Sequence, residues 1–129
     1  MEKRRFLIMA VALALSACGG GSGDSVDVSG IWHGGGTGQV DGKPVTITAT
    51  VTLAQSGSNV SGTFTSSSGN TGAIVATFDG SKLVGDMIPS NPGNCPAHLI
   101  WFYSANKLEG SVTSYNCSAS TGGTFTLTR

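Results

Sequence analysis

The chain has 129 residues, of which 39% are hydrophobic and 11% are charged, and its seven basic and seven acidic side chains leave no formal net charge. This length suits one domain with a modest core. Beyond residue 18, four basic residues are outnumbered by six acidic ones, and neither kind forms a run. Because nucleic-acid binding needs a basic patch or stripe, a nucleic-acid partner is not expected.

Residues 1–17 have the basic start and short apolar run of a secretory signal peptide. A basic start at Lys3–Arg5 precedes an apolar run from Phe6 to Leu15, which is too short to stay in a membrane as a spanning helix. The following "LSAC", ending at Cys18, resembles the lipobox. The resemblance implies cleavage before Cys18 and acylation of that cysteine, which would anchor the chain in a membrane. Because Gly19 follows in place of aspartate, it also implies sorting to the outer membrane, facing the periplasm.

After the lipobox, residues 18–25 carry only small and polar side chains beyond the cysteine, so we expect a flexible tether and a folded domain over 26–129. Two cysteines remain in this domain, Cys95 and Cys117. An even pair in an exported chain predicts a disulfide. Together with His98 they lack a fourth ligand at zinc spacing, so neither a metal site nor a cofactor is expected.

The domain shows no helical periodicity. The segment "PVTITATVTL" alternates strictly between apolar residues and threonine, which is typical of a half-buried strand. Turn-forming clusters recur about every ten residues. They separate eight predicted strands, near 28–34, 44–54, 59–66, 72–78, 82–89, 97–104, 107–114 and 122–129. The pattern predicts an all-β fold that is either a barrel or a β-sandwich.

A repeated glycine favours the barrel. Gly30, Gly62, Gly85 and Gly110 each follow the same short pattern and fall on the apolar face of their strands. Inward glycines permit the sharp bending that closure of a barrel requires. A sandwich would need a long crossover, and the only longer link is the proline-rich one before Cys95. We therefore expect an eight-stranded antiparallel up-and-down barrel, with a β-sandwich as the alternative.

The stretch Gly30-Ile31-Trp32 resembles the G-x-W motif on the first strand of lipocalins and avidin-like barrels. In those families a basic residue on the last strand packs over the tryptophan and closes the barrel end. The resemblance implies that Arg129, at the end of "GTFTLTR", takes this place. A cation over an indole ring contributes roughly 0.5–2 kcal/mol.

The same stretch continues as His33-Gly34-Gly35-Gly36, the sequence of the oxyanion loop of lipases and esterases. Such a loop serves a G-x-S-x-G nucleophile, and no serine stands in that pattern. No phosphate-binding helix or P-loop lysine is placed after it either. We expect Gly34 to Gly38 to form a flexible loop, His33 and His98 to be solvated or hydrogen-bonded, and the protein to have no catalytic residues.

Two functions remain, binding inside the barrel and contact through its surface. Val60, Leu83, Leu108 and Leu127 are predicted to point inward, and so are the residues chosen as contacts for a small apolar ligand, namely Phe64, Met87, Val112 and Phe125. The alternative is an apolar patch on the strands at 82–89 and 97–104, formed by Val84, Ile88, Ile100 and Phe102, for an envelope protein or a second copy of the chain. The opposite phase would instead expose Leu99, Trp101 and Tyr103, and the proline-rich loop is a possible cover.

Overall fold

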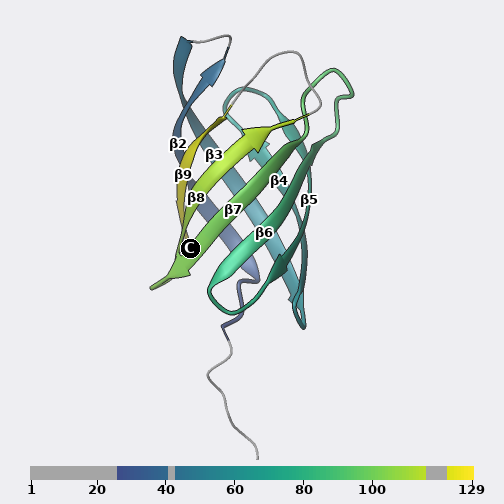
Figure 1. The fold of residues 1–129 in the computed structure, drawn as a ribbon, viewed down its shortest axis with the longest axis vertical. Helices are drawn as coiled ribbons and strands as arrows, with labels where there is room; N and C mark the ends of the chain where they lie inside the picture. The colour runs from purple at the N-terminus through teal and green to yellow at the C-terminus, as the bar shows by residue number, and fades with distance from the viewer. Residues whose placement is uncertain (1–25, 41–42, 116–121) are drawn as a thin grey trace, which may run out of the picture.

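A computed structural model describes residues 26–40, 43–115 and 122–129 of the chain. These residues form eight antiparallel strands, each hydrogen-bonded to the next, and the last pairs with the first to close a barrel (Figure 1). The strands are β2 (Gly30–Val40), β3 (Lys43–Ser56), β4 (Asn59–Ser66), β5 (Thr71–Phe78), β6 (Lys82–Pro89), β7 (Ala97–Ser104), β8 (Lys107–Ser114) and β9 (Gly122–Thr128). The predicted meander barrel is confirmed, and the sandwich alternative is wrong.

Strand β3 shows how the sequence pattern becomes a barrel wall. Its inward positions include Val51 and Leu53, which are buried, while the intervening Thr52 is exposed. Because successive side chains of a strand point to opposite faces, the apolar residues fill the interior and the threonines coat the outside. Among the described residues no helix is long and apolar enough to span a membrane.

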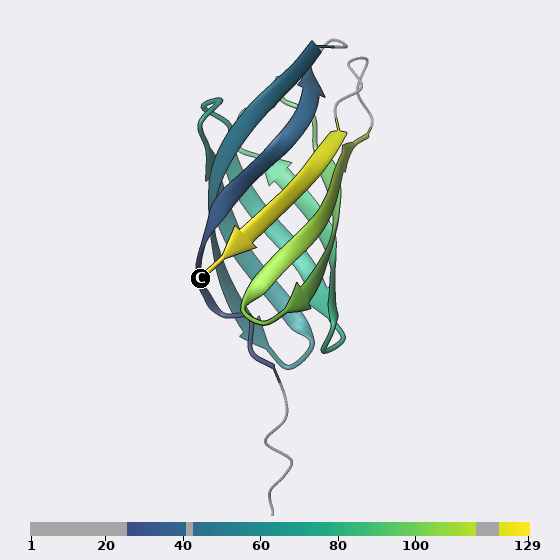
Figure 2. The same ribbon diagram turned by 90° about the vertical axis from the view of Figure 1, so that its left-hand side faces the viewer.

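The predicted loop from Gly34 to Gly38 is wrong, because these residues belong to β2. They pair with β3 on one side and with β9 on the other, and Figure 2 shows β9 lying between β2 and β8. A Cβ atom at Gly34 or Gly36 would overlap backbone oxygen atoms of β9. Glycine therefore lets the strands approach closely where the barrel closes, and it does not mark a loop here.

The recurring inward glycines have the same effect elsewhere in the wall. A Cβ atom at Gly62, Gly85 or Gly110 would overlap a backbone oxygen of the preceding strand. The absence of a side chain at these positions allows the sheet to bend inward, as the repeat predicted.

One end of the barrel is built from short turns. Strands β7 and β8 are joined by Ala105 and Asn106, whose φ angles are 50° and 60°, as in the tight turns that suit hairpins. The turn between β5 and β6 is held by Asp79, whose Oδ1 accepts hydrogen bonds from the backbone N–H groups of Ser81 and Lys82 at 2.9 and 2.8 Å. The longer connections of the described chain, such as 67–70 and 90–96, lie at the other end.

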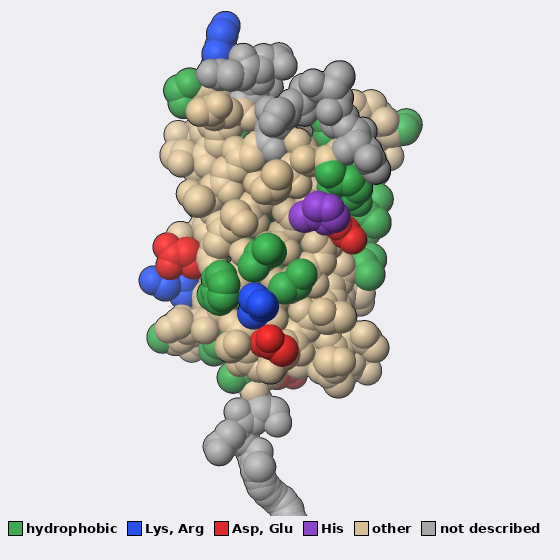
Figure 3. Space-filling view, viewed as in Figure 1, with side chains coloured by type: hydrophobic (Ala, Val, Ile, Leu, Met, Phe, Trp, Pro, Cys, Tyr) green, Lys and Arg blue, Asp and Glu red, His purple; other side chains and the backbone are tan. Residues whose placement is uncertain are grey.

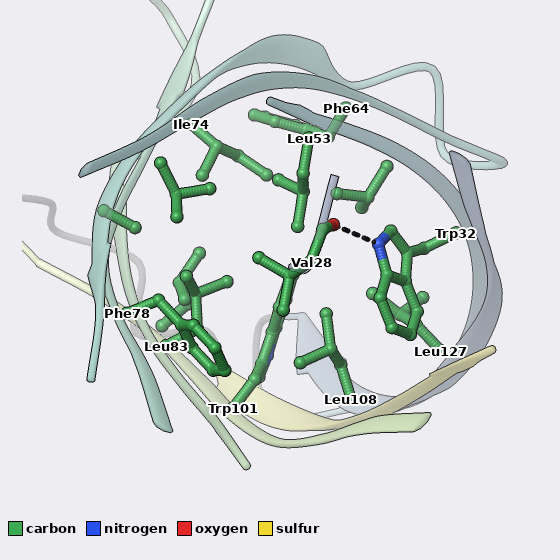
Figure 4. Close-up of a cluster of buried hydrophobic side chains, with 14 residues drawn as sticks. Val28, Trp32, Leu53, Phe64, Ile74, Phe78, Leu83, Trp101, Leu108 and Leu127 are labelled. Carbon is green, nitrogen blue, oxygen red and sulfur yellow. Dashed lines mark hydrogen bonds between the residues drawn. The ribbon is translucent and has the colours of Figure 1, made fainter. Parts of the chain in front are cut away.

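The end with the short turns is filled by the hydrophobic core. Val28 lies in the middle of the barrel, surrounded by side chains from the strands (Figure 4). Its carbonyl accepts a hydrogen bond from Trp32 Nε1 at 2.9 Å, and its N–H donates to Gln55 Oε1 at 2.8 Å. The chain before β2 thus plugs the barrel. Fully buried core residues include Trp32, Trp101, Ile74, Leu83, Leu99, Leu108 and Leu127.

Candidate functional site

Trp32 and Arg129 close the filled end of the barrel. The guanidinium carbon of Arg129 lies 4.7 Å from the centre of the Trp32 ring, in the place that the resemblance implied. One nitrogen, Nη1, donates to the carbonyls of Asp27 and Ser29 at 2.7 and 2.9 Å, while Nε and Nη2 reach Asn106 Oδ1 at 3.3 and 3.1 Å. Arg129 therefore ties the last strand to the chain before β2 and to the β7–β8 turn.

Asp27 adds to this closure. Hydrogen bonds from Ser29 to its carboxylate hold the pKa of Asp27 below its usual range, and the nearby Arg129 acts in the same direction. A carboxylate that is hydrogen-bonded in its charged form favours that form. The closed end is therefore held by packing, by a stacked cation and by a network of polar contacts.

The opposite end of the barrel is a cavity of about 590 Å³, which we call the cup. It is lined by inward-pointing residues near the strand ends that lie opposite the closed end. Phe64 belongs both to the buried core and to the lining, so it marks the floor. The apolar part of the wall is formed by Val45, Ile47, Ala49, Met87, Ala97, Val112 and Phe125.

The rim of the cup is polar. The connections 67–70 and 90–96 bring Asn70, Asn91 and Asn94 to the mouth, with Gln39 from β2. Asn94 Nδ2 donates to Asn70 Oδ1 at 3.0 Å, which joins the two connections. Asn91 Oδ1 accepts the N–H of Gly93 at 2.9 Å and shapes the second connection. None of the described lining residues carries a charge.

All four residues predicted as ligand contacts lie in the cup. Phe64 comes from β4, Met87 from β6, Val112 from β8 and Phe125 from β9. The other predicted inward residues, Val60, Leu83, Leu108 and Leu127, lie in the filled core. Sequence reasoning missed the rim asparagines, because asparagine in a connection is equally explained as a turn former.

The residues predicted as a partner patch point outward on β6 and β7. Val84, Ile88, Ile100 and Phe102 are 40–56% exposed, whereas Leu99 and Trp101 of the opposite phase are buried. Val84 and Ile100 are paired across the two strands. Val75 of β5, which was not predicted, is 58% exposed and pairs with Asp86 beside them. We call these five residues the outer apolar face.

The outer apolar face is interrupted by a polar cluster. Asp86 and His98 are paired across β6 and β7, with 2.6 Å between Asp86 Oδ1 and His98 Nδ1. The His98 ring stacks on Tyr115 with 4.0 Å between ring centres. Figure 3 shows hydrophobic side chains gathered over this face, with a histidine beside an acidic side chain among them. The face is therefore a mixed surface.

The histidines lie away from the cup lining. His33 is exposed on β2, with its Nδ1 3.4 Å from Thr50 Oγ1, and His98 is exposed on β7. Neither residue lines the cup. Within the described ranges, no three His, Cys, Asp or Glu side chains are grouped so that they could hold a metal ion.

The cysteine predictions fall partly on residues beyond the described ranges. Cys95 is half-buried and lines the cup from the connection before β7. Its predicted partner Cys117, the lipidation residue Cys18 and the segments 1–17 and 18–25 all lie outside the described residues. The disulfide and the lipid anchor stay predictions.

Comparison with protein-family models finds no match, and comparison with curated proteins finds none. The closed eight-stranded antiparallel barrel is consistent with the lipocalin-like fold that the G-x-W resemblance implied.

Proposed function

We propose that this chain is a non-catalytic binding protein of the bacterial cell envelope that holds a small apolar ligand in its cup. The observation that carries the proposal is the open cavity of about 590 Å³ at one end of an otherwise filled barrel. Small-ligand sites are concave, mostly apolar and roughly 300–1,000 Å³ in volume. The cup has this size and this kind of wall.

The filled end supports the proposal because it gives the cup a rigid base. The plug at Val28 and the hydrogen bonds of Arg129 hold the strands in place at the closed end of the barrel. Toward the mouth, the same strands then direct Phe64, Met87 and Phe125 into the cup. A preformed site spends less free energy on ordering when it binds.

The proposed anchor is the lipid on Cys18, at an outer membrane and facing the periplasm. Val26, the first described residue, packs against the core at the closed end. The tether would therefore attach at the end opposite the mouth, leaving the cup open to the aqueous side. Changing Cys18 to Ser should leave an unprocessed precursor without acyl chains. Wild-type protein that is freely soluble and still carries Ala17 would contradict the anchor.

Binding can be tested by filling the cup. Ala49→Phe adds a ring at an inward lining position, and Ala54→Phe adds the same ring at an exposed position on the same strand. We expect the neutral fluorescent probe N-phenyl-1-naphthylamine to bind wild type and Ala54→Phe alike, and to lose roughly tenfold or more of its affinity for Ala49→Phe. Equal binding to all three, or no binding to wild type, would contradict the proposal.

A second candidate is contact through the outer apolar face, with a second copy of the chain or another envelope protein. Its specific support is the cross-strand pair Val84 and Ile100, with Phe102 56% exposed beside it. Changing Ile100 and Phe102 together to Ser should abolish self-association measured by sedimentation, while costing only about 1 kcal/mol of stability. Association that survives this change, or wild-type protein that is a monomer at high concentration, removes the self-association form of this candidate.

A further inference from the structure

The lining of the cup is divided by depth into two chemical zones. The deeper wall is aliphatic and aromatic, with Met87, Val112 and Phe125 above the floor at Phe64. The rim carries side-chain amides and hydroxyl groups. A ligand that satisfies both zones has an apolar body and a polar head that stays at the mouth.

The charge of the polar head decides which amphipathic ligands suit the cup. The described lining residues include no Asp, Glu, Lys, Arg or His. Lys43, at the start of β3, is exposed and does not line the cup. A charged head held at this rim loses part of its hydration and gains no ion pair with a described lining residue in return. The wall therefore disfavours carboxylates and ammonium groups alike.

The rim amides suit a head that both donates and accepts hydrogen bonds. The bond between Asn94 Nδ2 and Asn70 Oδ1 uses one donor and one acceptor. The Oδ1 of Asn94 and the Nδ2 of Asn70 make no side-chain bond to another described residue, so the pair still offers a ligand both hydrogen-bond acceptors and N–H donors. A hydroxyl or an amide matches that pair, because each of these groups both donates and accepts.

We infer that the cup takes an uncharged amphipathic molecule, with an apolar chain or ring system inside and a neutral hydroxyl or amide head at the rim. This inference rests on the proposed binding function. It narrows the ligand class from small apolar molecules in general to neutral single-headed ones, and it excludes free fatty acids and cationic amphiphiles as the preferred class.

The test uses one alkyl chain with three heads: 1-decanol, decanoate and decylammonium, each displacing N-phenyl-1-naphthylamine at pH 7.4. We expect decanol to bind roughly tenfold or more tightly than either ion. Equal affinity for the three, or tighter binding of an ion, would overturn the inference and leave the proposed function standing. If neither the probe nor any of the three binds, the proposed function itself is wrong.

A charge placed at the rim should reverse the preference. Ser68, in the connection between β4 and β5, is exposed and lines the mouth, so Ser68→Lys adds a cation without burying it. This variant should gain severalfold in affinity for decanoate, with decanol unchanged. Ser58→Lys, in the exposed turn between β3 and β4 at the closed end, is the matched control and should behave as wild type. A wild-type profile for Ser68→Lys would mean that the head does not lie at this rim.

Discussion

The closed end of the barrel and the cup are made from the same eight strands with the same alternation, yet one is filled and the other is open. The closed end receives two tryptophans, Trp32 and Trp101, and the inserted Val28. Toward the mouth, inward positions are occupied by small residues such as Ala49 and Ala97. Side-chain volume along each strand, with one plugging segment, thus decides where a barrel of this size leaves room for a ligand.

The largest expected difference in stability is between two phenylalanine-to-alanine changes, one at the closed end and one in the cup. Phe78 is 3% exposed in the filled end, whereas Phe125 is half-buried in the cup wall. Phe78→Ala should lower the free energy of unfolding by about 3–5 kcal/mol, and Phe125→Ala by about 1 kcal/mol, as measured by urea denaturation. Equal losses would show that the two ends are packed alike, which contradicts the contrast drawn between them.

The predicted disulfide concerns the open end. If Cys95 is bonded to Cys117, closing a loop of this length contributes roughly 3 kcal/mol in the chain-entropy model. Cys117→Ser should lower stability by about that amount, and reduction of wild type should have the same effect. Rapid alkylation of both thiols in folded, unreduced protein would exclude the bond.

Arg129 tests how the closed end is held. Arg129→Ala removes the cation above Trp32 and four hydrogen bonds, so we expect a loss of about 1–2 kcal/mol in unfolding free energy. Arg129→Lys keeps the charge without the fork of donors and should lose less. Affinity for a cup ligand should change little in either variant. A large loss of binding would mean that the two ends are coupled.

The smallest change in stability is expected when the pH is lowered. Hydrogen bonds lower the pKa of Asp27 and of Asp79, both at the closed end, below the reference value of 3.8. Their contribution to stability is therefore complete above that value and is lost as pH falls through the lowered pKa. Asp79→Asn should flatten part of this decline in stability curves measured between pH 5 and pH 2. An unchanged decline would mean that Asp79 does not contribute to it.

The sequence predicts most of this fold because short-range signals and pairing agree. Alternation in β3 and the turn at Ala105 and Asn106 set strand limits that the structure reproduces closely. The stretch from Gly34 to Gly38 is the exception. Local composition indicates a loop there, but pairing with β3 and β9 determines the outcome, and pairing between distant strands cannot be read from four glycines and a threonine.

The site was predictable only in part. The alternation of apolar and polar residues along each strand showed which side chains point inward, and so identified Phe64, Met87, Val112 and Phe125. The same alternation also selected Leu83 and Leu108, which lie in the filled core, because it does not show how far along the barrel axis an inward side chain lies. Depth depends on where Val28 enters the barrel, and that is a property of the tertiary structure.

The central claim is that ligand binds in the cup and nowhere else. The most direct measurement is a titration of ¹⁵N-labelled protein with 1-decanol, followed by backbone and indole N–H chemical shifts. We predict shifts at cup residues such as Ala97, Val112 and Gly123, with the indole N–H of Trp32 and the amides of Ile100 and Phe102 unmoved. Shifts confined to β6 and β7 around Ile100 and Phe102, or no shifts at all, would contradict the account.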